Sequence, residues 1–323
     1  MFRVLLTDRA WPETSIEREI LAEIDAELIE APAGDEETLC RLAVDVDAIA
    51  TTWARVTPQV LQSAPRCRTV SRLGIGLDNI AVDFATSLGI PVTNVPDYCV
   101  GEVADHALAL LLAAARNVAF FHGRTRAGEY QLSAGPPMRR LAGQTLGLFG
   151  FGKIARNLVP KARALGMQVI AHTPSRNDRG TGCEMVSLEE LLERSDFVSL
   201  HAPLTPATCH AFQLPQFQRM RPTAWLINTS RGGLVDHADL AAALEQRLIA
   251  GAALDVFEPE PPDLSLPLYR DERVIVTPHA AFVSVESLEE LRRRAFRQVV
   301  AVLRGERPEN VVNPEVYGNT RVR

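Results

Sequence analysis

The chain has 323 residues, of which 46% are hydrophobic and 23% are charged, and its formal net charge at pH 7 is −6. This size and composition predict a globular protein of two ordinary domains and argue against global disorder. The negative net charge argues against nucleic acid as a partner, because a nucleic-acid-binding face is strongly basic.

The cysteines and the N-terminus indicate the compartment. Five scattered cysteines without a C-x-x-C pair predict free thiols in a reducing environment, with neither a disulfide framework nor a metal site. Asp8 and Arg9 interrupt the N-terminal apolar residues too early for a signal peptide. The longest apolar run, Ala107 to Ala115, is shorter than the roughly 20 residues that a membrane-spanning helix needs. We therefore expect a cytoplasmic protein without a membrane partner.

Residues 1–98 alternate short apolar runs, typical of buried strands, with segments of helical spacing. Strands are expected at Phe2–Leu6, Glu27–Ile29, Ala48–Thr51, Thr69–Leu73 and Pro91–Val95, and helices near Ile16–Ile24, Glu36–Leu42, Pro58–Ser63 and Val82–Ser87. Strands that alternate with helices predict a parallel sheet covered on both faces, that is, one α/β domain.

The next segment, Glu102 to Arg116, has the pattern of a helix that is apolar on most sides. Because a helix without a polar face is buried, we expect it to lie between the domains. A second alternation follows, with strands expected at Thr145–Phe149, Gln168–His172, Phe197–His201, Ala224–Asn228, Ile249–Leu254 and Val274–Thr277, and helices near Ile154–Leu165, Leu188–Arg194 and His237–Gln246. This pattern predicts a second, doubly wound domain.

A last helix is expected to begin near Ser284 or Ser287 and to stop at Gly305. Its apolar stripe consists of Leu288, Leu291, Ala295, Val299 and Val302. Too few residues follow it for an independent domain, so we expect it to return to the first domain. The predicted domains are therefore 1–98 with 286–323, and 99–285.

The stretch Thr145 to Pro160 contains a G-x-G-x-x-A turn between a predicted strand and a predicted helix, made by Gly150, Gly152 and Ala155. In a dinucleotide-binding fold, the first glycine makes the tight turn, the second lets the backbone approach a pyrophosphate, and the small third residue lets the helix pack on the strand. Backbone N–H groups and the positive helix end then face the phosphates. A turn that binds no ligand is the alternative for the motif alone.

Three further polar segments each follow a predicted strand of the second domain: NTSRGGLVD (228–236), ALDVFEPEPP (253–262) and VTPHAAF (276–282). Because ligands bind at the carboxyl ends of strands in open α/β sheets, Arg231, Glu260 and His279 are expected to converge. An arginine fits a carboxylate, a histidine moves protons near neutral pH, and a carboxylate on the other ring nitrogen orients the histidine. Taken singly, the three residues also fit a surface ion pair, a solvated carboxylate and a helix cap.

These segments, with RLGIGLDNI (72–80) and SDFVSLHAPLT (195–205), resemble the D-isomer-specific 2-hydroxyacid dehydrogenase family over nearly the full length. The stretches NVPDYCVGEVADHALALLL and TPHAAFVSVESLEELR are most similar to the branch that includes the C-terminal-binding proteins. The resemblance implies a Rossmann cofactor domain and a flavodoxin-like substrate domain with a cleft between them. It also implies a homodimer through the cofactor domain, and hydride transfer between NAD(P)H and C2 of a small 2-hydroxy or 2-keto acid.

The resemblance implies roles for individual residues. Arg231 would hold the carboxylate and 2-oxygen of the substrate, His279 would exchange the proton on that oxygen, and Glu260 would support His279. The other substrate-binding residues would be Arg72, Gly74, Ile75, Gly76 and Phe282. The cofactor-binding residues would be Gly150, Gly152, Lys153 and Ile154 at the pyrophosphate, Ala202 and Pro203 at the adenosine half, and Thr229, Asp255 and Ala281 at the nicotinamide half, together with Ser230. Asp255 fits equally a strand-end carboxylate that accepts from backbone donors.

The chain departs from the usual family pattern after the second strand of the cofactor domain. The family places an acidic residue there to bind the ribose diol, whereas this chain has Thr173, followed by Ser175 and Arg176. With no carboxylate to repel a 2′-phosphate, these residues favour NADP(H), and NAD(H) is the alternative. His106 and His201 are expected to be packed rather than catalytic.

A dinucleotide-sensing scaffold, like the C-terminal-binding proteins, is the rival function. The joint presence of Arg231, Glu260 and His279 favours an enzyme, because a scaffold does not need them. Among enzymes, Glu260 argues against formate oxidation, where this fold carries a glutamine, and Ile75 argues against phosphite oxidation, where relatives carry a lysine. Glyoxylate, hydroxypyruvate, phosphoglycerate and larger keto acids all stay open as substrates.

Overall fold

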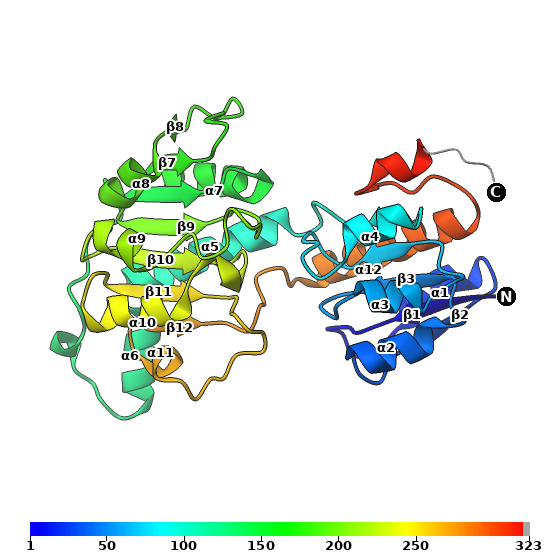
Figure 1. Ribbon diagram of the computed structural model, residues 1–323. Helices are drawn as coiled ribbons and strands as arrows, with labels where there is room; N and C mark the ends of the chain where they lie inside the picture. The colour runs from blue at the N-terminus through cyan, green and yellow to red at the C-terminus, as the bar shows by residue number, and fades with distance from the viewer. Residues whose placement is uncertain (319–323) are drawn as a thin grey trace. The chain divides into compact units, whose positions relative to one another are not determined.

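The computed structural model describes residues 1–318 and divides the chain into two compact units. Unit 1 contains Met1–Tyr98 and the residues from Ser284 onward, and unit 2 contains Cys99–Val283 (Figure 1). Residues 319–323, which the predicted range 286–323 includes, lie outside the described residues. No single helix in residues 1–318 is long and apolar enough to cross a membrane. One pair of consecutive helices, Val100–Ala115 and Val118–Arg126, is long and apolar enough when taken together, but it is bent by 64°.

Unit 1 is built on a five-stranded parallel sheet with the strand order β2-β1-β3-β4-β5. Its strands are β1 (Phe2–Leu6), β2 (Ala26–Glu30), β3 (Ala48–Thr51), β4 (Val70–Arg72) and β5 (Val92–Thr93). This is the flavodoxin-like order of a doubly wound fold. The predicted strands are present. Where the bounds of a unit 1 strand differ from the prediction, the observed strand is in most cases the shorter one.

Helices cover both faces of this sheet (Figure 1). On one face lie α2 (Glu36–Ala43), α3 (Pro58–Gln62) and α4 (Val82–Ser87) in succession, and on the other α1 (Ser15–Ala22) packs against α12 (Val285–Leu303). The α12 residues Leu291, Ala295, Val299 and Val302 are buried, as the predicted stripe requires, while Leu288 is half-buried. Ser284 caps this helix by accepting a hydrogen bond from the N–H of Ser287 at 2.9 Å.

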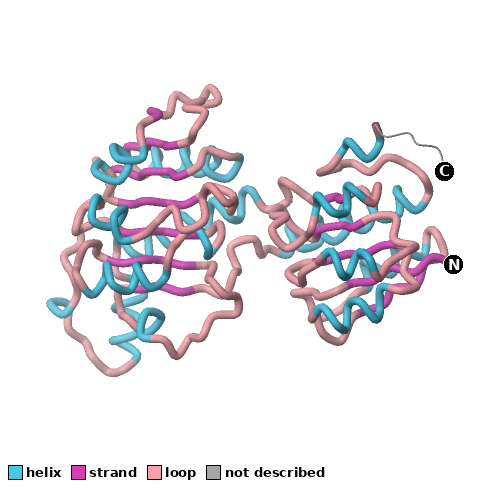
Figure 2. Tube along the Cα trace, in the orientation of Figure 1, coloured by secondary structure: helices cyan, strands magenta, loops and turns pink. Residues whose placement is uncertain are grey.

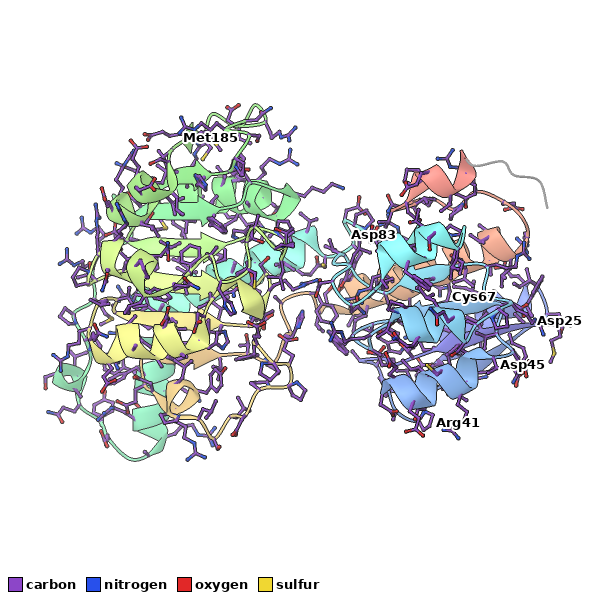
Figure 3. The ribbon with its side chains drawn as sticks, viewed as in Figure 1. Asp25, Arg41, Asp45, Cys67, Asp83 and Met185 are labelled. Atoms are coloured by element: carbon purple, nitrogen blue, oxygen red, sulfur yellow. The ribbon has the colours of Figure 1, made fainter. Side chains whose placement is uncertain are left out.

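The interior of unit 1 is mostly apolar, and the charged side chains buried there, such as Glu17 and Arg292, are paired. Figure 3 labels Cys67, whose side chain is buried in this core, and Asp25, Arg41 and Asp45, which are exposed. Burial raises the pKa of the Cys67 thiol to about 12. Cys67 is thus an uncharged core side chain at neutral pH, and all five cysteines are free thiols.

Unit 2 contains a seven-stranded parallel sheet in the order β12-β11-β10-β9-β6-β7-β8. Figure 2 shows the strands in magenta, with helices in cyan around them. Its strands are β6 (Thr145–Phe149), β7 (Gln168–His172), β8 (Glu184–Met185), β9 (Phe197–Leu200), β10 (Trp225–Asn228), β11 (Gly251–Leu254) and β12 (Val274–Val276). The chain runs outward from β6 in one direction through β7 and β8, and then returns to β9 on the other side of β6. The strand order therefore reverses beside β6, which is where ligands bind in open α/β sheets.

One face of this sheet carries α5 (Val100–Ala115) and α7 (Lys153–Ala164), which pack together. The other helices of unit 2 are α6 (Val118–Arg126), α8 (Leu188–Arg194), α9 (Leu214–Arg219), α10 (His237–Glu245) and α11 (Pro267–Arg270). The sequence pattern did not indicate α6, because none of its residues is buried and it has no apolar stripe. It also missed α9, α11 and the two-residue strand β8, which are too short to show a period.

The contacts of α5 lie within unit 2. Its buried side packs on α7, β10 and β11 inside unit 2, while Asp105 and Ala109 are exposed. The apolar sequence indicated a buried helix, and its expected place between the domains stays a prediction. One face is enough to bury a helix of this composition, so the apolar pattern alone overstates how much of it is covered.

Candidate active site

The predicted site residues of unit 2 directly follow its parallel strands. Arg231 follows β10, Asp255 and Glu260 follow β11, and His279 follows β12. Since β10, β11 and β12 are neighbours in parallel register, their carboxyl ends lie at one edge of the sheet. The loops that carry the candidate catalytic residues therefore begin side by side.

The structure brings His279 and Glu260 into direct contact. Nδ1 of His279 lies 2.8 Å from Oε2 of Glu260, and the other carboxylate oxygen accepts a hydrogen bond from the N–H of Phe257 at 2.8 Å. A carboxylate only accepts hydrogen bonds, so Nδ1 of the imidazole carries the proton and donates. Nε2 is then the nitrogen turned away from Glu260, which is the arrangement of an oriented acid–base histidine.

The Arg231 loop is packed against the segment that leads to Glu260. A side chain at Gly232 would place its Cβ 1.9 Å from the carbonyl oxygen of Phe257, so only glycine allows this approach. Asn228, fully buried at the end of β10, donates to the carbonyl of Arg231 at 2.8 Å and accepts from the N–H of Ser230 at 3.0 Å. The sequence analysis did not single out Asn228. Its position as an amide side chain at the end of a predicted strand could have indicated a role in shaping the loop that follows.

Phe282 lies next to the histidine, with ring centroids 6.0 Å apart and the rings nearly perpendicular. Asp255 and Ala281 are buried, and Oδ2 of Asp255 accepts a hydrogen bond from the N–H of Ala281 at 2.9 Å. Burial, the largest single effect, raises the pKa of Asp255, but hydrogen bonds from His106, Thr277, Ala280 and Ala281 together bring it below its usual value. Asp255 is therefore a buried carboxylate ion at neutral pH.

The glycine turn has the geometry expected for a phosphate-binding loop. Gly150 has a φ of +92°, and a Cβ there would lie 2.6 Å from the backbone nitrogen of Ala202. At Gly152, the N-cap of α7, a Cβ would meet nothing within 4 Å, and as a glycine this N-cap residue has no side chain to cap the helix. The third residue of the turn, Ala155, is fully buried in the core that includes Leu146 and Leu148. The α7 N-terminus, which includes Lys153 and Ile154, thus fits an anionic group.

A second observation near this edge also fits a bound nucleotide. The hydroxyl of Thr229 is buried, and no group among residues 1–318 hydrogen-bonds to it. Its neighbour Ser230 donates to the carbonyl of Ala202 at 2.7 Å, which links the β10 and β9 loops, and Pro203 is exposed beside it. A buried hydroxyl without a partner is costly, so a ligand group that bonds to Thr229 would remove that cost.

The residues expected near the adenosine ribose follow β7. The N–H of Arg176 donates to the carbonyl of Thr173 at 3.0 Å, so residues 173–176 form a tight turn. Ser175 and Arg176 are exposed, and Thr173 is half-buried. His201, at the end of β9, lies 2.9 Å from the hydroxyl of Ser199, and burial lowers its pKa to about 4.

In unit 1 the structure brings Arg72, Gly74, Ile75 and Gly76 together in one turn after β4. The buried guanidinium of Arg72 donates to the carbonyls of Leu73 at 2.6 Å and Gly76 at 3.0 Å. A Cβ at Gly74 would lie 2.8 Å from the guanidinium carbon, so the turn wraps around the arginine. Arg72 thus has an evident role in shaping this loop.

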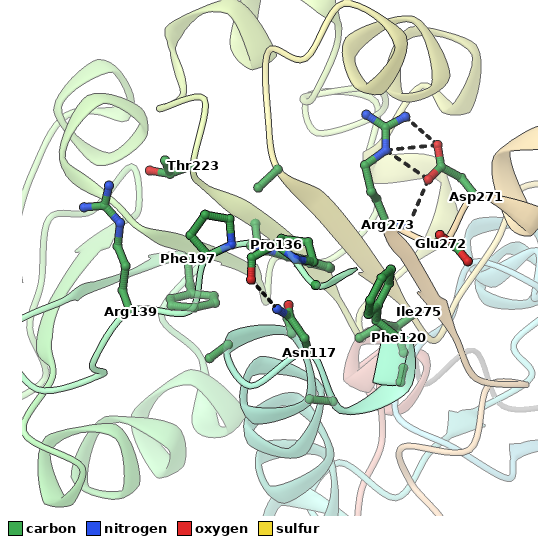
Figure 4. Close-up of a pocket in the computed structure, with 18 of the residues that line it drawn as sticks. Asn117, Phe120, Pro136, Arg139, Phe197, Thr223, Asp271, Glu272, Arg273 and Ile275 are labelled. Carbon is green, nitrogen blue, oxygen red and sulfur yellow. Dashed lines mark hydrogen bonds and ion pairs between the residues drawn. The ribbon is translucent and has the colours of Figure 1, made fainter. Parts of the chain in front are cut away.

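A cavity of about 740 Å³ lies elsewhere in unit 2 (Figure 4). It is lined by Phe197 and Trp225, which are the first residues of β9 and β10, and by Phe120, Ile275 and Arg273. These positions are at the amino ends of the strands, whereas the candidate site is at the carboxyl ends. In residues 1–318, no group of three or more His, Cys, Asp or Glu side chains is placed to hold a metal ion.

Comparison with known proteins gives consistent results. Residues 108–281 match the family model described as D-isomer specific 2-hydroxyacid dehydrogenase, NAD binding domain. A glyoxylate reductase from Korarchaeum cryptofilum is 39% identical over 322 residues, covering 97% of this chain and 96% of the relative. A D-3-phosphoglycerate dehydrogenase from Methanocaldococcus jannaschii is 37% identical over 318 residues, which are 97% of this chain and 60% of that protein.

Among solved structures, an NADPH-dependent glyoxylate/hydroxypyruvate reductase from Sinorhizobium meliloti, in complex with NADP and malonate, aligns with a TM-score of 0.86 and 29% identity. The alignment covers 96% of each chain. None of these three names refers to the C-terminal-binding-protein branch, so that finer placement stays a prediction. The matched model and the full-length similarity show that the chain belongs to the D-isomer-specific 2-hydroxyacid dehydrogenase family.

Proposed function

We propose that this chain is an NAD(P)H-dependent reductase of a small 2-keto acid, with His279, Glu260 and Arg231 as its catalytic group. The observation that carries the proposal is the 2.8 Å contact between Nδ1 of His279 and Glu260 at the carboxyl edge of the unit 2 sheet. The packing of the Arg231 loop against Phe257, just ahead of Glu260, supports the participation of Arg231.

In this mechanism Nε2 of His279 gives a proton to the 2-oxygen of the keto acid during reduction and takes it back in the reverse direction. Glu260 keeps Nδ1 protonated and stabilises the imidazolium form. The planar guanidinium of Arg231 binds the substrate carboxylate and polarises the 2-oxygen. The dinucleotide, when bound, supplies or accepts the hydride.

We place Gly150, Gly152, Lys153 and Ile154 at the pyrophosphate, and Thr229, Ser230, Asp255 and Ala281 at the nicotinamide half. Ala202 and Pro203 would flank the adenosine half. The uncapped α7 N-terminus and the unpartnered hydroxyl of Thr229 support this assignment. In unit 1, backbone N–H groups of Gly74, Ile75 and Gly76 would bind the substrate carboxylate, and Arg72 would hold their loop in shape.

The substrate we favour is glyoxylate or a keto acid of similar size. The support is the name of the Korarchaeum cryptofilum relative, together with Phe282, which gives the site an apolar wall beside His279. Hydroxypyruvate is the next candidate, on the name of the Sinorhizobium meliloti protein. A phosphorylated acid would need further cationic side chains to bind its phosphate group.

The direct test is turnover with NADPH and with NADH on a panel of 2-keto acids, followed by absorbance. His279→Gln should lower kcat by about 10²-fold or more, because it removes the proton donor. Steady reduction of one acid, lost in His279→Gln, supports the proposal. No turnover with any acid, together with tight binding of dinucleotide and of a partner protein, would instead favour the scaffold function.

For the cofactor we propose NADPH, because Thr173 brings no carboxylate to the turn that contains Ser175 and Arg176. Thr173→Asp should reduce the preference for NADPH over NADH by about tenfold or more, since a carboxylate repels the 2′-phosphate. Gln168→Glu adds the same charge at the exposed opposite end of β7 and serves as the control. A tenfold preference of the unaltered enzyme for NADH in kcat/KM would reject the assignment.

We further propose that the enzyme is a homodimer through unit 2. Its segment between α6 and β6 exposes large apolar side chains, with Tyr130 98% and Leu132 80% exposed. The cavity at the amino ends of the strands is partly lined by the same segment, at Pro136 and Pro137 (Figure 4). Large exposed apolar side chains of this kind are typical of a self-association surface.

A further inference from the structure

We propose that Thr277 and His106 are positioning residues, which hold Asp255 and through it fix the backbone of His279. This inference rests on the proposed function and assigns new roles to two residues for that reaction. The three side chains Asp255, Thr277 and His106 are called the Asp255 network below. They come from the end of β11, the end of β12 and the middle of α5.

Asp255 stabilises the backbone of the loop that carries His279. His279 has a φ of +53°, a left-handed conformation that is unfavourable for a residue with a side chain. The carbonyl of Asp255 accepts from the N–H of His279 at 2.8 Å, and its carboxylate accepts from the N–H groups of Ala280 and Ala281, each at 2.9 Å. One residue thus accepts from three consecutive backbone donors, the last two at its carboxylate, and an anion that accepts from successive N–H groups stabilises a turn of this kind.

Thr277 in turn binds the carboxylate of Asp255 by a hydrogen bond. The Thr277 hydroxyl lies 2.5 Å from Oδ1 of Asp255, and Nε2 of His106 lies 3.0 Å from the same hydroxyl. A hydroxyl has one hydrogen, and a carboxylate can only accept, so Thr277 donates to Asp255. Nε2 of His106 must then be protonated and donate to Thr277. It also lies 3.4 Å from Oδ1 of Asp255, so its proton faces the carboxylate as well.

The Asp255 network is rigid, because its members are buried or carried by a packed helix. Asp255 is fully buried, so its carboxylate has little freedom to adopt another position. His106 is carried by α5, which packs on α7, β10 and β11. The network therefore ties the loop of the acid–base histidine to a helix far away in the sequence. Loss of the Thr277 hydroxyl would leave Asp255 and His106 without their shared partner and loosen the turn at His279.

The matched variants are Thr277→Val and Thr277→Ser. Valine keeps the shape and removes the hydroxyl, whereas serine keeps the hydroxyl. We expect Thr277→Val to lower kcat by about tenfold or more, since small displacements of a catalytic group cost rate steeply, with the dissociation constant for NADPH changed by less than about threefold. Thr277→Ser should stay within about threefold of the unaltered enzyme in both quantities. The same contrast is expected for His106→Leu against His106→Gln, because glutamine retains a donor.

A general structural role would not produce this split between kcat and cofactor affinity, nor the rescue by serine. Equal kcat values for Thr277→Val and Thr277→Ser, or a parallel loss of cofactor affinity, would overturn the inference.

A readout without turnover separates this inference from the proposed function. In a ¹⁵N-histidine NMR spectrum, His106 should be protonated at Nε2, and Thr277→Val should shift the ring resonances of His279. If the protein reduces no keto acid but His106 has this tautomer, the proposed function fails and the network stands. A His106 ring protonated only at Nδ1 would refute the network even in an active enzyme.

Discussion

Two titratable side chains at the carboxyl ends of the unit 2 strands have lowered pKa values for different physical reasons. Burial alone lowers the pKa of His201 to about 4, so its imidazole is neutral at pH 7. For Asp255, burial acts in the opposite direction and is outweighed by four hydrogen-bond donors. The edge that we assign to the cofactor therefore contains a fixed negative charge on the nicotinamide side and an uncharged imidazole at β9.

The lowered pKa of His201 makes stability dependent on pH. Below its usual value of 6.5, the unfolded chain binds a proton that the folded protein takes up only near pH 4, so stability falls as the pH drops through this interval. One pKa unit corresponds to about 1.4 kcal/mol, so His201 should account for about 2 kcal/mol of the loss between pH 7 and 5.

Denaturant unfolding of the unaltered protein and of His201→Gln at pH 7 and pH 5 measures this effect. The variant should lose less stability over the interval, and His122→Gln, at an exposed position, controls for the removal of a histidine. An equal loss in His201→Gln and the unaltered protein would contradict the assignment.

At the scale of elements, a buried ion pair joins the first and last helices of unit 1. Nη2 and Nε of Arg292 on α12 lie 2.6 and 2.7 Å from the two carboxylate oxygens of Glu17 on α1, and the Glu17 side chain is fully buried. The guanidinium also stacks over Trp11, 5.2 Å from its ring centroid. The pair therefore links segments from opposite ends of the chain into one core.

Removal of one partner should be far more costly than removal of both. Arg292→Met leaves a buried carboxylate without its cation and should lower the free energy of unfolding by about 3 to 5 kcal/mol. The double variant Glu17→Leu with Arg292→Met should recover most of that loss, because an apolar pair replaces the charges. Chemical denaturation of the two variants tests this, and a double variant as unstable as the single one would refute it.

At the scale of the whole molecule, the proposed homodimer is the property to test. Tyr130→Lys combined with Leu132→Glu should convert the dimer to a monomer, because charged groups on an interface core must be desolvated. Val44→Lys, at a half-exposed valine of unit 1, is the matched control and should leave the dimer intact. Light scattering gives the mass directly. A monomeric unaltered protein, or a dimer that survives both substitutions, would reject the interface.

Much of the fold was predictable from local patterns. The central strands of both sheets are nearly uniform apolar runs, and helices such as α12 carry a clear stripe. The turn at Gly150 and Gly152 has a signature that depends only on adjacent residues. What the patterns did not predict were α6, which buries no residue, and the surroundings of α5, because an apolar helix does not encode which surface covers it.

By itself the sequence determined which residue types stand at the strand ends, and hence the family and the candidate trio of Arg231, Glu260 and His279. These are properties of short contiguous segments, each fixed by its own strand and turn. Only the tertiary structure decided that Nδ1 of His279 bonds to Glu260, and that His106 reaches Thr277 across 171 positions of the chain. Such hydrogen bonds depend on how the strands and α5 pack in three dimensions, and a single polar contact between distant segments leaves no periodic pattern in the sequence.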